Sequence, residues 1–375
     1  MGPLPPPPDH LRPRDVLVLG GGLVGASAAW LLVQRGHRVT LVAPQGQERS
    51  GSEAALGLLM ADVFHRGRGR AWQLRQRSRA LWDQWCAQLQ QEGWPLPRRR
   101  GLLLLAADAE EAERQRRLVA ERQAAGLPLE WWDRQRVAEL EPIVPAAAHG
   151  GLFSPRDGQI DPLSALGALL GSAQASGMQR LEGRALRLER RGSGGWRVIL
   201  DDGGRLEAPW AVVAAGLGSA ALLAHSPDAA TSAPGVVLEP VLGQALELEV
   251  PAPVPCAADS RAWPGALSWR GINLVPRPDR GPGRLWLGAT LEPGGRADPE
   301  ALERMQQLEG DAPPWLLQAR RREQWQGCRC RPVGRPAPLL EPLAEGLLLL
   351  SGHYRNGVLL APASAEWAVE QIERA

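Results

Sequence analysis

Residues 15–42 read DVLVLGGGLVGASAAWLLVQRGHRVTLV and carry the strongest structural signal in the chain. The apolar run Val16–Leu19 predicts a buried strand, and a glycine-rich turn leads from it into an apolar helix that stops near Gly36. Residues 38–42 predict a second strand. Such a β-α-β unit indicates a parallel sheet covered by helices.

The turn of this unit matches the pattern GxGxxG at Gly20, Gly22 and Gly25. In this pattern the first glycine makes a tight turn and the second lets backbone N–H groups approach a pyrophosphate. The third lets the helix pack closely on the strand. We therefore expect Gly20, Gly22, Leu23, Val24 and Gly25 to bind a dinucleotide.

The acid that usually binds the adenosine ribose is missing from its expected place at the end of the second strand. The residue there is Ala43, followed by Pro44. Glu48 and Glu53 are acids in the following loop that could substitute, and the alternative is a ribose held by backbone alone.

Composition excludes several classes of protein. The 43 basic residues are all arginines and are nearly balanced by 41 acids, so the net charge of +2 does not predict a nucleic-acid partner. No apolar run approaches the roughly 20 residues of a membrane-spanning helix, and the N-terminus lacks the apolar core of a secretory signal. A cytoplasmic protein is expected. The lone Cys328-x-Cys330 pair predicts no metal site.

The rest of the chain alternates between two styles. Helices are predicted over 70–93 and 108–125 around a strand at 101–106, then strands over 184–201 and 208–216. Short alternating strands between 240 and 292 are typical of an antiparallel sheet, and a strand at 347–350 and a helix at 363–372 end the chain. We therefore predict an α/β fold, with a Rossmann-like parallel-sheet domain for the nucleotide and an interleaved β-rich domain for the substrate. Expected bounds are a disordered Pro-rich lead at 1–14, a nucleotide domain at 15–70, 145–235 and 325–375, and a substrate domain at 71–144 and 236–324.

Two further segments favour FAD over NAD as the dinucleotide. Residues 51–59 are mostly small, so that a planar ring system can lie against backbone, and residues 212–219 run from a strand into a glycine turn at the same crevice. The expected contacts in these segments are Ala54, Ala55, Gly57, Leu58, Ala215 and Gly216.

Seven motifs in order resemble the D-amino-acid-oxidase-like flavoprotein family, and within it the glycine oxidases of thiamine biosynthesis. They are the glycine turn, AALGLL at 54–59, GLFSPRDGQIDP at 151–162, PVLGQ at 240–244, LVPR at 274–277 with LGATLE at 287–292, GCR at 327–329 and GHYRNGVLLAP at 352–362. The resemblance covers the chain from about residue 15 onward.

This resemblance implies an FAD-binding fold in which the loop after the 347–350 strand lies beside the flavin ring. Gly352, Asn356, Gly357, Val358 and Leu359 are then cofactor contacts, with backbone N–H groups of the last helix facing the pyrimidine edge. The implied reaction is hydride transfer from an amino acid to flavin N5. Oxygen then regenerates the flavin, and the products are a 2-oxo acid, ammonia and hydrogen peroxide.

Arg329 and Arg355 are the expected substrate residues, because a guanidinium can hold a carboxylate at two points. Arg331 is a neighbouring alternative for this role. Asn273 stands where the glycine oxidases carry a carboxylate-binding tyrosine, which implies a wider and more polar pocket. His353 is a weaker candidate for acid–base chemistry.

Other readings remain open from sequence alone. Trp263, Trp269 and Trp325 either line a pocket or fill the core. The substrate is glycine, sarcosine or a D-amino acid, and a homo-oligomer is compatible with the sequence. The alternatives are a D-amino-acid or N-methyl-amino-acid dehydrogenase with an acceptor other than oxygen, the FAD module of a tRNA-modifying enzyme, and a flavin-binding protein without turnover.

Overall fold

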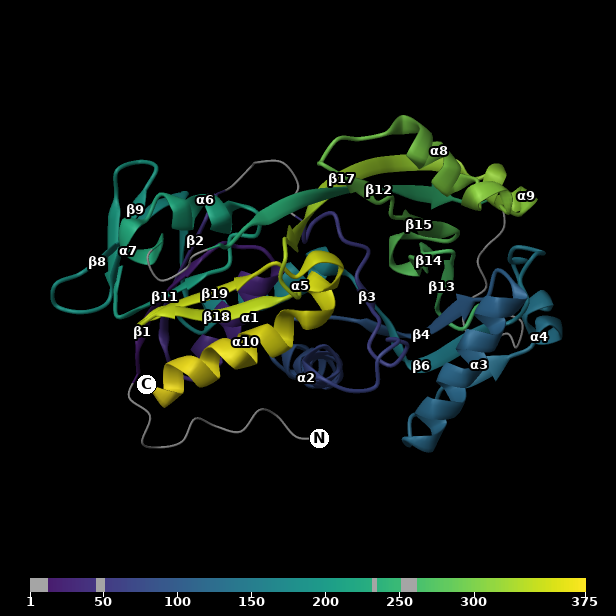
Figure 1. Cartoon of the computed structure of the whole chain (residues 1–375), viewed down its shortest axis with the longest axis horizontal. Coiled ribbons are helices and arrows are strands. Elements are labelled where there is room, and N and C mark those ends of the chain that lie inside the picture. The colour runs from purple at the N-terminus through teal and green to yellow at the C-terminus, as the bar shows by residue number, and fades with distance from the viewer. Residues whose placement is uncertain (1–12, 45–50, 231–234, 251–261) are drawn as a thin grey trace.

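A six-stranded sheet forms one half of the molecule, as Figure 1 shows for the computed structural model, which describes residues 13–44, 51–230, 235–250 and 262–375. The strand order is β18-β19-β11-β1-β2-β7, and every pair is parallel except β18 with β19. The predicted parallel sheet is confirmed. Its strands are β1 (Asp15–Leu19), β2 (Arg38–Ala43), β7 (Gln179–Glu182), β11 (Trp210–Val213), β18 (Leu339–Ala344) and β19 (Leu347–Ser351).

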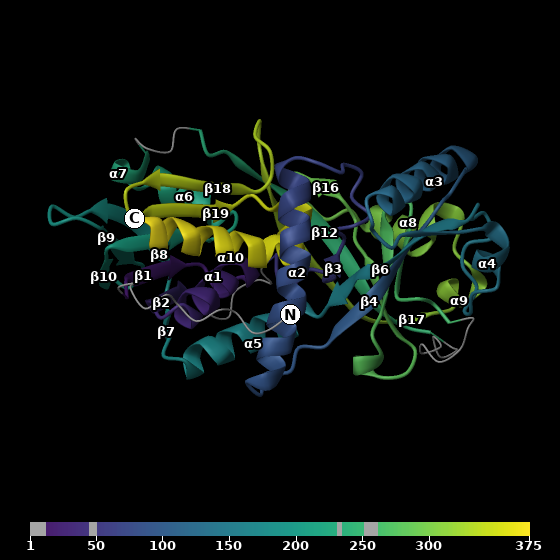
Figure 2. The same ribbon diagram turned by 90° about the horizontal axis from the view of Figure 1, so that it is seen from below.

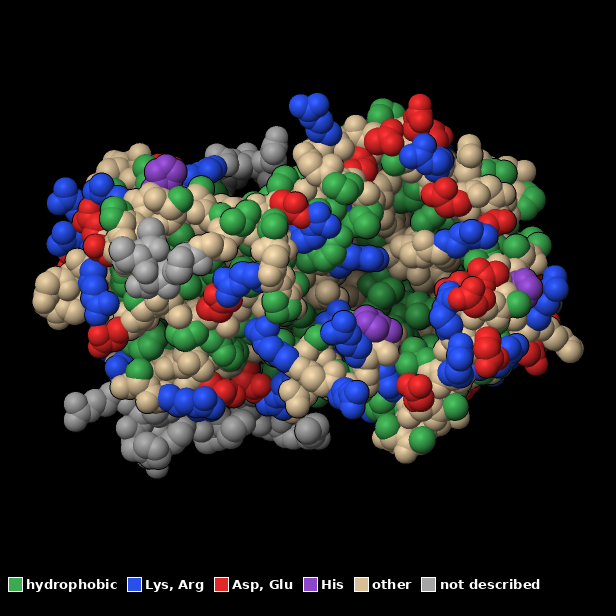
Figure 3. Space-filling view, in the orientation of Figure 1, with side chains coloured by type: hydrophobic (Ala, Val, Ile, Leu, Met, Phe, Trp, Pro, Cys, Tyr) green, Lys and Arg blue, Asp and Glu red, His purple; other side chains and the backbone are tan. Residues whose placement is uncertain are grey.

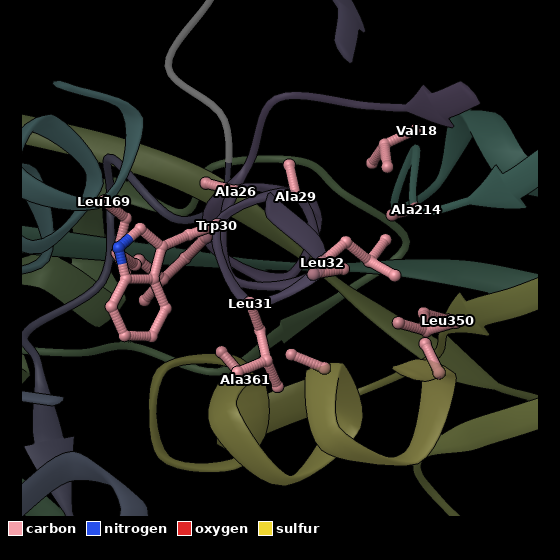
Figure 4. Close-up of a cluster of buried hydrophobic side chains, with 14 of the residues drawn as sticks. Val18, Ala26, Ala29, Trp30, Leu31, Leu32, Leu169, Ala214, Leu350 and Ala361 are labelled. Atoms are coloured by element: carbon pink, nitrogen blue, oxygen red, sulfur yellow. The ribbon is translucent and has the colours of Figure 1, made fainter. Parts of the chain in front are cut away.

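Four helices cover one face of this sheet (Figure 2). They are α1 (Leu23–Gln34), α2 (Arg70–Gln91), α5 (Pro162–Ala175) and α10 (Gly357–Arg374). The helix α1 packs against the sheet and has α10 and α5 beside it, so it is buried on almost every side, which explains its apolar sequence (Figure 4). Trp30 is fully buried there and donates from its indole nitrogen to Ser172 Oγ at 2.9 Å.

The opposite face of the parallel sheet packs against a small antiparallel sheet and two short helices. The small sheet has the order β10-β9-β8. These elements are β8 (Ala185–Arg190), β9 (Trp196–Leu200), β10 (Arg205–Ala208), α6 (Gly218–Ala224) and α7 (Pro227–Ala230).

A ten-stranded sheet forms the other half of the molecule, and all of its pairs are antiparallel except β13 with β4. The central order is β16-β12-β15-β14-β13-β4-β6-β3, with β17 beside β12 and β5 beside β6. The strands are β3 (Leu58–Leu59), β4 (Arg98–Leu105), β5 (Glu130–Trp132), β6 (Gly151–Ile160), β12 (Leu238–Glu249), β13 (Ala266–Trp269), β14 (Ile272–Pro276), β15 (Arg284–Gly288), β16 (Glu292–Pro293) and β17 (Arg320–Pro332). Its helices are α3 (Ala109–Ala124), α4 (Arg134–Ala138), α8 (Pro299–Gln306) and α9 (Pro314–Leu317). Short 3₁₀ turns lie at η1 (Pro278–Arg280) and η2 (Leu308–Gly310), and another, η3 (Tyr354–Asn356), lies between β19 and α10.

The mixed α/β fold with one parallel and one antiparallel sheet is therefore as predicted, whereas some element lengths differ. The strand β12 spans 12 residues rather than forming short pieces, because it pairs with β17 along its whole length. The exact two-domain boundaries stay a prediction. Two elements bear on these bounds. The helix α2, which the prediction placed mostly in the substrate domain, contacts α10 and α5. The strand β6, which it placed in the nucleotide domain, lies in the ten-stranded sheet. The proposed Pro-rich lead falls outside the described residues except for Pro13 and Arg14.

The last helix begins six residues earlier than its predicted start at 363, and Pro362 lies inside it. A proline has no N–H, so in a helix it leaves the carbonyl four residues before it without its donor. Here that carbonyl belongs to Val358, and it accepts from the Trp82 indole nitrogen at 3.0 Å. A side chain of α2 thus replaces the missing helix hydrogen bond and keeps the first turn of α10 in place.

Across the described ranges, no helix combines the length and the apolar character that a membrane crossing needs. The same part of the chain holds no group of three or more His, Cys, Asp or Glu side chains able to bind a metal ion.

Candidate functional site

A large cavity of about 2140 Å³ lies where the carboxyl ends of the parallel strands meet the ten-stranded sheet. Figure 3 shows a hollow on this face, with apolar side chains on its floor and arginines around it. The ends of β1, β2, β11 and β19 all contribute lining residues. Ligands of open α/β sheets bind at this edge of the sheet. The volume exceeds that of an ordinary small-ligand pocket, which is roughly 300–1,000 Å³.

The glycine turn after β1 forms one wall of the cavity. Gly20 has a φ of +120°, and a Cβ there would lie 2.4 Å from the Ala214 carbonyl oxygen. A Cβ at Gly25 would lie 1.9 Å from the Gly20 carbonyl oxygen, so this glycine serves helix packing. A Cβ at Gly22 would meet only Ser52 Oγ, at 3.2 Å, and would otherwise point into open space. The backbone at Gly22 is therefore open to a ligand, as pyrophosphate binding requires.

The first turn of α1 borders this wall and contains no acid. A helix N-terminus carries a partial positive charge and favours an anion such as phosphate. Ser52 Oγ accepts from the Leu23 N–H at 2.8 Å and also lines the cavity. Sequence reasoning missed Ser52, because its contact lies 29 residues away along the chain.

The small-residue loop after β2 forms the next part of the lining and is fixed to β6. Gly57 has a φ of +80°, and a Cβ there would lie 1.8 Å from the Ile160 carbonyl oxygen. The Gly57 carbonyl in turn accepts from the Ile160 N–H at 3.0 Å. Ala54 holds the loop to the other sheet, since its carbonyl accepts from the Trp325 indole at 3.1 Å.

Asp157 fixes the segment that follows this loop. Its carboxylate is fully buried and accepts from the backbone N–H groups of Ala61, Asp62 and Val63 at 2.8 to 3.1 Å. Burial, together with the charge of Asp62, raises the pKa of Asp157 to about 6. In the sequence, Asp157 was visible only as part of the GLFSPRDGQIDP motif, without a role of its own.

Replacing Asp157 by alanine is expected to lower the free energy of unfolding by about 3–5 kcal/mol, because three buried N–H groups lose their acceptor at about 1–3 kcal/mol each. Chemical denaturation of purified wild-type and variant proteins measures this difference. The control is Asp202→Ala, which removes an exposed turn carboxylate that accepts from Gly204 N–H, and its cost should stay below about 1 kcal/mol. Equal effects of the two changes would contradict the role given to Asp157.

The loop between β19 and α10 closes the cavity on another side. Gly352 and Tyr354 both have positive φ angles, of +63° and +53°. Ser351 Oγ donates to the Gly216 carbonyl at 3.0 Å, which joins this loop to the turn after β11. The predicted cofactor contacts in the loop after β19 and in the turn after β11 therefore lie together at one wall of the cavity.

His353 points into the protein and bonds to α10, although its residue borders the cavity. Its Nε2 lies 2.8 Å from Ser364 Oγ, and only 6% of the residue is exposed. Burial, assisted by the charge of Arg70, lowers its pKa to about 3. The imidazole is thus neutral at pH 7, which argues against the acid–base role considered from sequence.

The depressed pKa of His353 predicts a pH-dependent stability. An unfolded histidine has a pKa near 6.5, so this group stabilises the fold above that pH and loses the contribution as the pH falls towards 3. Between pH 7 and pH 5 the stability advantage of the wild type over His353→Gln should shrink by about 2 kcal/mol. Denaturation at the two pH values tests this, with the exposed His225→Gln as control. A pH-independent difference would contradict the assignment.

The substrate-binding candidates lie on the far side of the cavity, where β17 borders it. Arg329 donates from Nη1 to the carbonyl oxygens of Leu242 and Thr290, both at 3.1 Å. Burial and the neighbouring charge of Arg355 lower the pKa of Arg329. A Cβ at Gly243 would lie 2.4 Å from the guanidinium nitrogens, so this glycine makes the space that Arg329 occupies. The signal for Gly243 was present only as part of the PVLGQ motif.

Two further candidates line the same region. Arg355 is exposed within the cavity and close enough to Arg329 to affect its pKa. Asn273 is 9% exposed; its Nδ2 donates to the Gly271 carbonyl at 3.4 Å, and its Oδ1 has no hydrogen-bond partner in the described structure. Arg331, the alternative to Arg329, forms an ion pair with Glu239 and does not line the cavity.

Almost all residues predicted for the site line this one cavity; only Gly25 and Leu359 do not. Gly25 packs against Gly20, and Leu359, in the first turn of α10, is buried in the hydrophobic core. The predicted residues that line it are Gly20, Gly22, Leu23, Val24, Ala54, Ala55, Gly57, Leu58, Ala215, Gly216, Asn273, Arg329, Gly352, Arg355, Asn356, Gly357 and Val358. Of the three tryptophans considered, Trp325 lines the cavity, whereas Trp263 and Trp269 belong to the core.

The end of the cavity near β2 differs from the usual ribose site. Ala43 lines it, as do Glu53 and the arginines Arg180 and Arg184 from the neighbouring β7 region. Glu48 lies outside the described residues. Over its whole described lining the cavity has seven arginines and two glutamates, although the chain as a whole is nearly neutral. Its electrostatic character therefore suits a ligand with phosphate and carboxylate groups.

Comparison with known proteins agrees with this geometry. Residues 15–371 match the DAO family, described as FAD dependent oxidoreductase. The chain belongs to this family, and FAD is its cofactor. The open backbone at Gly22, the α1 N-terminus and the basic lining fit a dinucleotide, as described above.

Proteins similar to this chain include a glycine oxidase and a bifunctional tRNA-biosynthesis protein. The glycine oxidase of Geobacillus kaustophilus is 29% identical over 369 residues, which are 96% of this chain and 93% of the relative. The crystal structure of that species' glycine oxidase matches with a TM-score of 0.82 and 27% identity, over 96% of this chain and 95% of the other. The tRNA 5-methylaminomethyl-2-thiouridine biosynthesis bifunctional protein MnmC of Pseudomonas paraeruginosa is 30% identical over 96% of this chain, which spans only 56% of that relative.

Proposed function

We propose that this protein catalyses the FAD-dependent oxidative deamination of a small amino acid, namely glycine, sarcosine or a D-amino acid. In the overall reaction the amino acid, oxygen and water give a 2-oxo acid, ammonia or an amine, and hydrogen peroxide. The similarity to glycine oxidases supports this class of reaction.

One observation carries the proposal: two guanidiniums lie close together in the cavity that the glycine turn borders. Arg329 is held by two backbone carbonyls rather than by an acid, and its neighbour Arg355 is exposed within the cavity. Burial and, after it, the charge of Arg355 lower the pKa of Arg329, and an anion bound between the two guanidiniums would offset both effects. A planar carboxylate is the natural partner, since a guanidinium binds it through two parallel hydrogen bonds.

The bound FAD supplies the redox chemistry by accepting the hydrogen and electron pair of the substrate α-carbon. The protein contributes orientation: Arg329 and Arg355 hold the carboxylate, and Asn273 Oδ1 offers an acceptor to a substrate N–H. The glycine turn, the small-residue loop and the start of α10 are the proposed cofactor contacts. His353 faces inward and takes no part in this scheme, which needs no side-chain base when the substrate amine is uncharged.

The test begins with the purified protein and its visible spectrum. Bound FAD should be present, and peroxide release should identify one or more substrates among glycine, sarcosine and D-alanine. Anaerobic addition of the same compounds should bleach the flavin absorbance. Bound flavin that none of these amino acids bleaches would contradict the proposal and favour a flavin-binding protein without turnover.

The same preparation separates the other candidates. A dehydrogenase would be reduced by the amino acid but reoxidised much faster by a quinone or dye than by oxygen, which stopped-flow absorbance measures. The similarity to the MnmC protein makes the FAD module of a tRNA-modifying enzyme a second candidate. That function requires tRNA binding that weakens with added salt. We expect no such binding, because the chain carries a net charge of only +2.

A further inference from the structure

Arg75 is a buried cation on α2 that lines the cavity and was not singled out from sequence. Only 9% of the residue is exposed, and its Nη2 donates to Asn356 Oδ1 at 3.0 Å. Its Nε is buried and has no hydrogen-bond partner in the described part of the chain. The guanidinium carbon lies 3.9 Å from the centre of the Phe64 ring.

The surroundings of Arg75 do not neutralise its charge. Burial lowers its pKa, and no carboxylate among the described residues offsets that effect. One helical turn further on, the half-buried Arg79 lies 3.8 Å from Asp62 and 3.4 Å from Asp83. A buried charge without an opposite charge is costly, so proteins rarely keep one. The missing negative charge at Arg75 is therefore expected to come from a ligand bound in the cavity.

Arg75 stands at the point where α2 holds the beginning of α10. Asn356, its partner, immediately precedes α10, and Ser78 and Trp82 on the same helix contact Ala363 and Val358 of α10. The backbone N–H groups of the first turn of α10 carry a partial positive charge. The guanidinium and the helix terminus thus contribute positive potential to the same wall of the cavity.

We propose that Arg75 is the electrostatic partner of the negative charge that the FAD ring carries after reduction. Uptake of two electrons and one proton turns the neutral oxidised ring into a reduced ring with one negative charge. A nearby cation stabilises this form more than the neutral one, and so raises the reduction potential. The inference rests on the proposed position of the flavin ring beside the start of α10. It makes Arg75 a positioning and electrostatic residue rather than a substrate ligand.

The experiment measures the midpoint potential of bound FAD by equilibration with a reference dye in the intact holoenzyme. Arg75→Gln keeps a hydrogen-bond donor for Asn356 but removes the charge, and its potential should fall by at least about 30 mV, which is a tenfold loss of preference for the reduced cofactor. Arg75→Lys keeps the charge and should stay within about 10 mV of the wild type, a shift of roughly twofold. The control is Arg77→Gln, whose side chain pairs with Glu366 and does not line the cavity, and its potential should not change.

The outcomes separate this inference from the proposed function. A purified wild type without FAD would refute both. Arg75→Gln with a full flavin spectrum and an unchanged potential would overturn only the role of Arg75, since a purely structural residue alters stability without altering the potential. If Arg75→Gln cannot be loaded with FAD, Arg75→Lys decides: a potential 30 mV or more below the wild type despite the retained charge also overturns the proposal.

Discussion

Replacing Arg329 by leucine is expected to lower kcat/KM for the best amino-acid substrate by about 30- to 4,000-fold, because truncating one partner of a buried charge pair costs about 2–5 kcal/mol. Arg329→Lys keeps the charge but loses the planar guanidinium, so its kcat/KM should lie between those of the wild type and of Arg329→Leu. Steady-state peroxide release over a range of substrate concentrations measures both variants. Bound FAD, read from the visible spectrum, should be unchanged, because the glycine turn lies at another part of the cavity.

The matched control for this change lies two residues further along the same strand. Arg331 pairs with Glu239 outside the cavity, so Arg331→Leu should leave kcat/KM within about twofold, as for an ordinary surface ion pair. Activity of Arg329→Leu within tenfold of the wild type would remove Arg329 from the substrate site. A large loss in Arg331→Leu alone would exchange the roles of the two arginines.

Replacing Gly22 by alanine is expected to weaken FAD binding by about 10²–10³-fold while leaving the folded apoprotein intact. The φ and ψ angles of Gly22 are −70° and 175°, which alanine adopts freely, and the added Cβ meets only Ser52 Oγ. That Cβ would nevertheless occupy the side from which the pyrophosphate approaches. Losing two charge-assisted hydrogen bonds to backbone N–H groups costs about 3–4 kcal/mol. Titration of the apoprotein with FAD measures the dissociation constant, and thermal denaturation of the apoprotein checks the fold.

A second glycine provides the control for this experiment. Gly167 lies exposed on α5 with no atom within 4 Å of an added Cβ, and it does not line the cavity. Gly167→Ala should leave FAD affinity unchanged and stabilise the protein by about 0.5–1 kcal/mol, since alanine favours a helix. An unaltered FAD affinity in Gly22→Ala would show that the pyrophosphate does not bind at this turn.

The parts of this structure that the sequence predicted well are those with a local cause. The strand, glycine turn and helix of residues 15–34 follow from residue periodicity and glycine spacing. The predicted residues around the cavity, Arg329 and Arg355 included, came from short motifs that keep their order along the chain. Their convergence on one cavity is the most direct agreement between the sequence and the structure, although their binding roles stay predictions.

The parts that the sequence did not predict depend on contacts between distant residues. Arg75 lies 281 residues from Asn356, and Trp82 lies 276 residues from Val358. A local rule ends a helix before a proline, and here it failed because an indole from α2 supplies the missing donor. Asp157 was visible as a motif residue, but its N–H partners lie about 95 residues away. No pattern within one segment indicates such pairings.

The position of β19 and α10 also constrains when the protein can become functional during its synthesis. These two elements lie at Leu347–Ser351 and Gly357–Arg374, yet β19 lies inside the sheet between β11 and β18, and α10 packs against α1. On the ribosome the nucleotide-binding turn emerges more than 300 residues before β19 and α10, so one wall of its cavity is missing until these two elements have emerged. Cofactor capture should therefore wait until β19 and α10 have emerged, and a nascent chain halted before β19 should leave the edge of β11 open to aggregation.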